Sequence, residues 1–104
     1  MKKYKLFYTQ EVKTFLSELK EQISLENGFS TAYKFFKELD KKINLLSDFP
    51  NMGTFDNSCG LDFIYHYPYF IYHVVDHTAT TVDIISIWHG ARGYFNPSDY
   101  CIDN

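Results

Sequence analysis

The sequence has 104 residues, of which 45% are hydrophobic and 19% aromatic, and it carries a formal net charge of −3. This length predicts a single domain, residues 1–104, and the apolar content excludes a disordered chain. No apolar run reaches the ~20 residues of a bilayer-spanning helix. Because the N-terminus also lacks the apolar stretch of a secretory signal, we expect a cytoplasmic protein without membrane contact.

The charge is divided between the two halves of the chain. Residues 1–42 contain nine lysines against six acidic residues, whereas residues 43–104 contain seven aspartates against a single arginine, Arg92. Domains that grip nucleic acid normally present a basic face. The acidic second half therefore argues against sequence-specific DNA binding by this chain.

The first half predicts one strand followed by two helices. Residues 4–8 are aromatic-rich and predict a strand. Thr9 is a suitable N-cap for an amphipathic helix over residues 10–24, and Ser30 is a suitable cap for a second over residues 30–47. The short Asn-Gly turn between them predicts an antiparallel helical hairpin.

The second half predicts a loop and three strands. We expect the loop at residues 50–60 and strands at residues 61–67, 69–76 and 81–89, followed by an irregular tail. The predicted fold is α+β: an N-terminal strand, an antiparallel helical hairpin, and a three-stranded antiparallel meander that completes one sheet.

The last predicted strand is apolar on both faces. Simple alternation places Ile85 and Ile87 on one face, with the other set, Val82, Ile84, Ser86 and Trp88, on the opposite face. This pattern is typical of a central strand or of one covered by helices.

Three segments resemble a known superfamily when they are taken in order. They are Pro50–Gly53 (PNMG), Tyr69–Val74 (YFIYHV) and Ile84–Arg92 (IISIWHGAR). Together they resemble the ParE/RelE superfamily of toxins from type II toxin–antitoxin systems, over nearly the whole chain. The YFIYHV and HGAR runs are similar to those of the ParE branch.

The resemblance implies one of two activities. ParE-like members poison DNA gyrase by direct binding and trap it with broken DNA, whereas RelE-like members are ribosome-dependent mRNA endonucleases. Both kinds are neutralised by an antitoxin whose flexible segment wraps the toxin. The implied partners are therefore a cognate antitoxin and either gyrase or the ribosome with mRNA, and no cofactor is expected.

The ParE reading requires a contact surface. Aromatic and arginine side chains usually supply the anchoring energy of such surfaces, and suitable types gather at the end of the last strand. The candidate target-binding residues are Trp88, His89, Arg92, Tyr94 and Phe95. Arg92 also has the planar fork that the nine lysines lack.

The RelE reading requires proton transfer and phosphate binding, for which His89, His66 and Arg92 are the candidates. Against it, Tyr69 stands where RelE-like nucleases carry an arginine, and the surrounding half of the chain is acidic. A third reading is a binding module without toxicity, because Leu61 and Asp62 occupy a region where both branches often carry an arginine.

Two further groups of residues complete the candidates. Lys34, Lys37 and Lys41 form a stripe on the second helix that suits an acidic antitoxin segment, or simply a solvated face. His73 and His77 are four residues apart, about 13 Å along a strand. No metal site is therefore expected.

Overall fold

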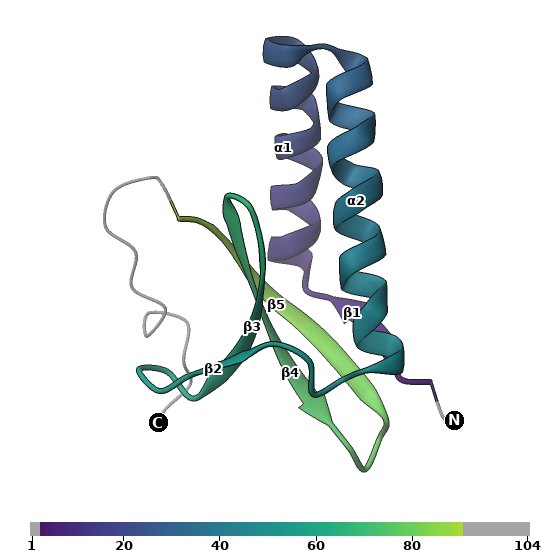
Figure 1. Cartoon of the computed structure of the whole chain (residues 1–104), viewed down its shortest axis with the longest axis vertical. Coiled ribbons are helices and arrows are strands. Elements are labelled where there is room, and N and C mark those ends of the chain that lie inside the picture. The colour runs from purple at the N-terminus through teal and green to yellow at the C-terminus, as the bar shows by residue number, and fades with distance from the viewer. Residues whose placement is uncertain (1–2, 91–104) are drawn as a thin grey trace.

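The computed structural model describes residues 3–90, and its element order agrees with the predicted one except for one additional short strand, β2 (Figure 1). The elements in chain order are β1 (Lys5–Tyr8), α1 (Gln10–Asn27), α2 (Phe29–Asp48), β2 (Thr54–Asp56), β3 (Leu61–His66), β4 (Tyr69–Asp76) and β5 (Thr81–His89). None of the helices among residues 3–90 is both long enough and apolar enough to span a bilayer.

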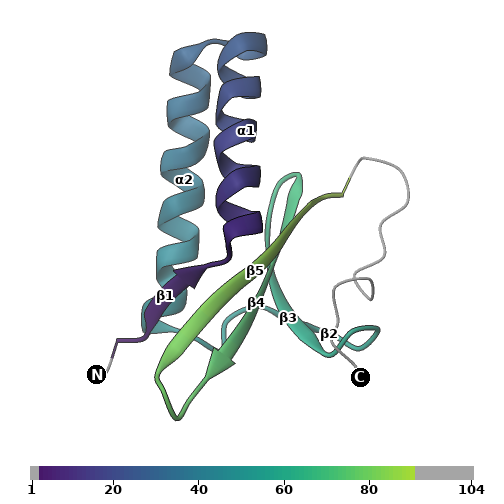
Figure 2. The same cartoon turned by 180° about the vertical axis from the view of Figure 1, so that it is seen from behind.

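The five strands form one mixed sheet in the order β1-β5-β4-β3-β2. The meander β3-β4-β5 is antiparallel, as predicted, and β1 joins its β5 edge in parallel. The helical hairpin lies on one side of this sheet and extends beyond it at the α1–α2 connection (Figures 1 and 2). The α+β prediction is confirmed.

The predicted loop at residues 50–60 contains a strand, which corrects the sequence analysis. β2 pairs antiparallel with β3, with Thr54 opposite Phe63. Its last residue, Asp56, accepts a hydrogen bond at 2.9 Å from the hydroxyl of Tyr72 on β4. Three residues carry too short a pattern to identify a strand; the pairing with β3 creates it.

Helix boundaries follow local chemistry at one end of the hairpin and chain geometry at the other. The Thr9 hydroxyl accepts a hydrogen bond from the Val12 amide at 3.2 Å, so the predicted N-cap of α1 is confirmed. The predicted cap at Ser30 is wrong, because α2 already begins at Phe29. Gly28, at a φ of +94°, is the single residue between the helices and the N-cap of α2, and as a glycine it has no side chain that could cap the helix.

The core lies between the hairpin and the sheet. Aliphatic side chains from both helices pack against the inner positions of β4 and β5. The most deeply buried members are Val12, Leu39, Ile43, Leu46, Ile71, Val82 and Ile84. This packing fixes the position of the sheet relative to α1.

A β-bulge at Ile85 changes which side chains of β5 face the helices. His73 pairs with Ile84, but the preceding residue Tyr72 pairs with Ser86, so Ile85 has no partner on β4. Ile84 precedes the bulge in the helix-facing core, and Ile87 follows it in the same core. The predicted simple alternation is therefore wrong beyond Ile84, because one extra residue inverts the period.

Candidate functional site

Three strand ends meet at one end of the meander. His66 ends β3, Tyr69 begins β4 and His89 ends β5, and the antiparallel register pairs His66 with Tyr69 and Tyr69 with His89. The Tyr69 and His89 rings meet edge to face, with centroids 5.0 Å apart and planes at 82°. Sequence positions separated by more than twenty residues thus form one row across the sheet.

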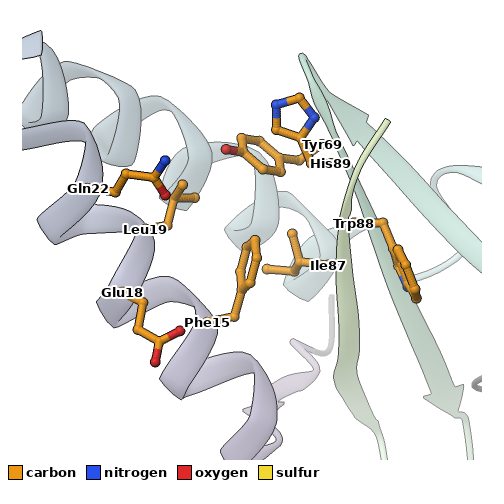
Figure 3. Close-up of a pocket in the computed structure, with 8 residues that line it drawn as sticks. All are labelled: Phe15, Glu18, Leu19, Gln22, Tyr69, Ile87, Trp88 and His89. Atoms are coloured by element: carbon orange, nitrogen blue, oxygen red, sulfur yellow. The ribbon is translucent and has the colours of Figure 1, made fainter. Parts of the chain in front are cut away.

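Aromatic side chains of the two helices pack against this row of rings. Phe15 of α1 and Phe35 of α2 pack against Tyr69 with ring centroids at 6.1 and 5.7 Å, and Phe35 also lies 5.2 Å from His66. Between α1 and the row is an open hollow of about 410 Å³ (Figure 3). Its described lining residues are Phe15, Glu18, Leu19, Gln22, Tyr69, Ile87, Trp88 and His89.

The electrostatics at the β3 end favour a neutral imidazole. Burial lowers the pKa of His66, and the nearby Lys42 ammonium lowers it further, while Glu38 opposes the shift. Lys42 donates its own hydrogen bond to the backbone carbonyl of Tyr65. At neutral pH His66 is therefore uncharged and can accept a proton, but contributes no positive charge for a phosphate.

The two candidate histidines do not border the same hollow, because His89 is among the described lining residues of the 410 Å³ hollow and His66 is not. Neighbouring strands lie about 4.8 Å apart, so positions on β3 and β5 are separated by roughly 10 Å. Tyr69, only 6% exposed, lies on the strand between them. A general base and a general acid must both reach the atoms around one phosphate. The proposed pairing of His66 with His89 therefore lacks support from this geometry.

The end of β5 is held close to the start of β4 by a glycine. The Gly90 amide donates a hydrogen bond to the Pro68 carbonyl at 2.8 Å. A Cβ at Gly90 would lie 2.5 Å from Cε2 of Phe70, closer than real contacts permit. Gly90 thus allows the Phe70 ring and the Pro68 carbonyl to approach closely.

The predicted target-binding residues do not all lie on one surface. Trp88 points away from the hairpin, whereas His89 lies beside Tyr69 on the hairpin side (Figure 3). Arg92, Tyr94 and Phe95 lie outside the described residues. The Trp88 and His89 side chains therefore lie on opposite faces of the sheet.

The lysine stripe lies apart from this site. Lys34, Lys37 and Lys41 are all exposed on α2, and the Lys37 ammonium lies 5.8 Å from the ring centroid of Tyr33. The spacing of three and four residues places them on one helix face, opposite the buried Leu39. The predicted solvent stripe is thus present.

Sequence reasoning missed the contribution of α1 to the site. Glu11, Phe15, Glu18 and Gln22 follow one another at spacings of four, three and four, which is a single helix face. This face borders the buried stripe of Val12 and Leu19, so it lines the hollow while its polar side chains stay exposed to solvent. The spacing was available in the sequence, but the neighbouring strand was not.

The two remaining histidines lie in different environments. His77 lies 2.8 Å from the hydroxyl of Tyr4 through its Nδ1 atom, and His73 is buried. Within residues 3–90 no three His, Cys, Asp or Glu side chains gather closely enough to hold a metal ion.

Comparison with known proteins shows similarity over most of the chain. The family model described as "ParE toxin of type II toxin-antitoxin system, parDE" matches residues 6–94. Among solved structures, a chain of the chromosomal ParDE toxin–antitoxin system of P. aeruginosa superposes with a TM-score of 0.68 at 16% identity. The superposition covers 83% of this chain and 95% of that one, and shows a shared fold. No match was found among curated proteins.

Proposed function

Because the chain belongs to the ParE toxin family of type II toxin–antitoxin systems, we propose that it is a toxin that inhibits DNA gyrase by direct binding. A cognate antitoxin neutralises it, and growth inhibition is the consequence of unneutralised expression. The same activity would stabilise a plasmid that carries the pair.

One observation carries the choice of gyrase over RNA cleavage. Tyr69 lies between the two histidines that the nuclease interpretation requires, and the neutral His66 offers no positive charge to a phosphate. This arrangement disfavours joint action of both histidines on one phosphate. A surface for a large protein target needs no such pair, since its energy comes from anchoring side chains.

The proposed contact residues lie at and beyond the end of β5. Trp88 supplies an aromatic side chain on the face away from the hairpin, and His89 a polar one on the hairpin side. We assign Arg92, Tyr94 and Phe95 to the same target contact on the basis of residue type and position in the sequence. The Gly90 amide hydrogen bond to the Pro68 carbonyl holds the end of β5 in place.

The exposed lysines of α2 are the proposed contact for an acidic stretch of the antitoxin. Lys34, Lys37 and Lys41 project from the helix face opposite the core, so they can be charge-reversed without disturbing packing. Reversal of all three is expected to weaken antitoxin binding. An unchanged affinity would remove this surface from the proposal.

The test is a supercoiling assay with purified gyrase, relaxed plasmid and the intact chain. We expect inhibition with accumulation of cleaved plasmid, which Arg92→Ala and Trp88→Ala reduce. His66→Ala is the matched control, because it should leave gyrase inhibition intact yet impair a nuclease. No inhibition at large molar excess over gyrase would refute the proposal. Ribosome-dependent mRNA cleavage lost in His66→Ala would then identify the RelE-like activity, and absence of both would indicate a non-toxic binding module.

A further inference from the structure

The hollow beside His89 continues toward the start of α1. A second hollow of about 180 Å³ is lined by Glu11, Val12, Phe15, Ile85, Ser86 and Ile87. It shares Phe15 and Ile87 with the 410 Å³ hollow, so the two form one groove, here called the α1–β5 groove. The groove runs between the outer face of α1 and the second half of β5.

One wall of this groove is an open strand edge. β1 pairs with β5 only from Thr81 to Ile84, and the last link is the Thr9 amide, which donates to the Ile84 carbonyl at 3.2 Å. Beyond that point the chain of β1 turns into α1. Among residues 3–90 no strand pairs with this edge of β5 at Ile85–Ile87. Such an edge presents main-chain groups to an extended peptide.

The other wall is acidic around an apolar centre. Along α1 the groove meets Glu11, then Phe15, then Glu18, and Phe15 faces Ile87 across it. Both glutamates are exposed, and seven residues of helix separate their Cα atoms by roughly 10 Å. The described lining residues include no lysine or arginine. The bulge at Ile85 contributes directly, because it turns Ile87 toward this wall.

From these features we propose that the α1–β5 groove binds an extended protein segment with a small apolar residue flanked on the same face by basic residues. The apolar side chain would pack on Phe15 and Ile87, and the basic side chains would pair with Glu11 and Glu18. In a strand, inward residues four apart are about 13 Å apart, a span that flexible Lys or Arg side chains match to the two glutamates. That the antitoxin carries this segment rests on the proposed function; the chemistry of the segment rests on the groove alone.

The preference differs from that of α2. The lysine stripe suits acidic residues, whereas the α1–β5 groove suits basic ones. A partner that occupies both surfaces must therefore change the sign of its charge between its two contacts, which sets a strict requirement on the order of its sequence.

The test uses two end-blocked peptides, TKTVTKT and TETVTET, titrated into the ¹⁵N-labelled intact chain. We expect TKTVTKT to shift the backbone amide resonances of Ile85–Ile87 and to bind at least about threefold more tightly than TETVTET, since each exposed ion pair contributes up to about fivefold. The double variant Glu11→Gln, Glu18→Gln should lose this preference. Glu21→Gln, which changes the same charge on α1 outside the groove lining, should keep it.

Equal binding of both peptides, no binding of either, or shifts located away from Ile85–Ile87 would overturn the inference. The supercoiling assay is run on the same preparations. Peptide binding without gyrase inhibition would refute the proposed function and leave the groove assignment standing. Gyrase inhibition without peptide binding would do the reverse.

Discussion

Replacing His73 with phenylalanine should stabilise the protein. His73 is 1% exposed, and within the described residues neither ring nitrogen has a well-formed hydrogen bond. A buried polar group left unsatisfied costs about 1–3 kcal/mol, and an apolar ring of similar shape removes that cost. The phenyl ring is slightly larger than the imidazole, so tighter packing offsets part of this stabilisation. We expect a net increase of about 1–2 kcal/mol in the free energy of unfolding at pH 7.5.

The same substitution should change how stability depends on pH. Burial lowers the pKa of His73, although the Asp62 carboxylate and the Ile71 carbonyl oppose the shift. The unfolded chain therefore binds a proton below its pKa of about 6.5 while the folded chain does not, so folding weakens as the pH falls. One such histidine costs at most about 1.4 kcal/mol per pH unit. The advantage of His73→Phe should thus grow between pH 6.5 and 5.5.

Urea unfolding followed by Trp88 fluorescence at pH 7.5 and 5.5 measures both effects. His77→Phe is the matched control, because His77 is exposed and already partnered by Tyr4, so no buried polar atom is removed. A His73→Phe variant that is less stable at both pH values, with an unchanged pH slope, would refute the reasoning. It would show that His73 has a partner, such as an internal water.

Three further substitutions test local features. Gly90→Ala should cost about 1–3 kcal/mol in unfolding free energy, measured by urea titration, because its Cβ would lie 2.5 Å from Phe70; full stability would contradict the close approach. Thr9→Ala should lower the free energy of unfolding by about 1 kcal/mol, because it removes the cap of α1. Ser30→Ala should change it by less than about 0.5 kcal/mol, because Ser30 does not cap α2. Equal effects of the two substitutions in thermal melts would contradict the corrected α2 boundary. Tyr72→Phe should lower the free energy of unfolding by about 1.5–3 kcal/mol, because the Tyr72 hydroxyl donates a hydrogen bond to the Asp56 carboxylate. A double-mutant cycle of Tyr72 with Asp56 that shows no coupling would contradict this.

The elements that the sequence predicted well are those whose signals are local. The strands at residues 69–76 and 81–89 were predicted at their observed bounds, and the Thr9 cap located the start of α1. The start of α2 was missed because Gly28 alone makes the turn, which a cap-seeking argument centred on Ser30 cannot detect.

The features that were missed depend on contacts between elements. The parallel pairing of β1 with β5 and the existence of β2 follow from which strands become neighbours. The bulge at Ile85 has the same origin, because it is defined by the partners of Tyr72 and His73 on another strand. One extra residue exchanges the two faces of the strand, so an error of this kind propagates to every later position.

That exchange decides what the end of β5 can do. Without the bulge, Trp88 would share the helix-facing side with Ile84, and His89 would point away from the hairpin. With it, His89 packs on Tyr69 beside the α1–β5 groove, and Trp88 is placed on the opposite face of the sheet. One strand end therefore presents a polar ring to the groove and an aromatic ring to the other side. Under the proposed function the chain contacts both gyrase and an antitoxin, so a substitution that removes the bulge should impair both contacts together. Trp88→Ala should impair gyrase inhibition more than peptide binding, because its side chain points away from the hairpin although the residue also borders the larger hollow (Figure 3). Measuring gyrase inhibition and peptide binding on the same variant compares the two contacts.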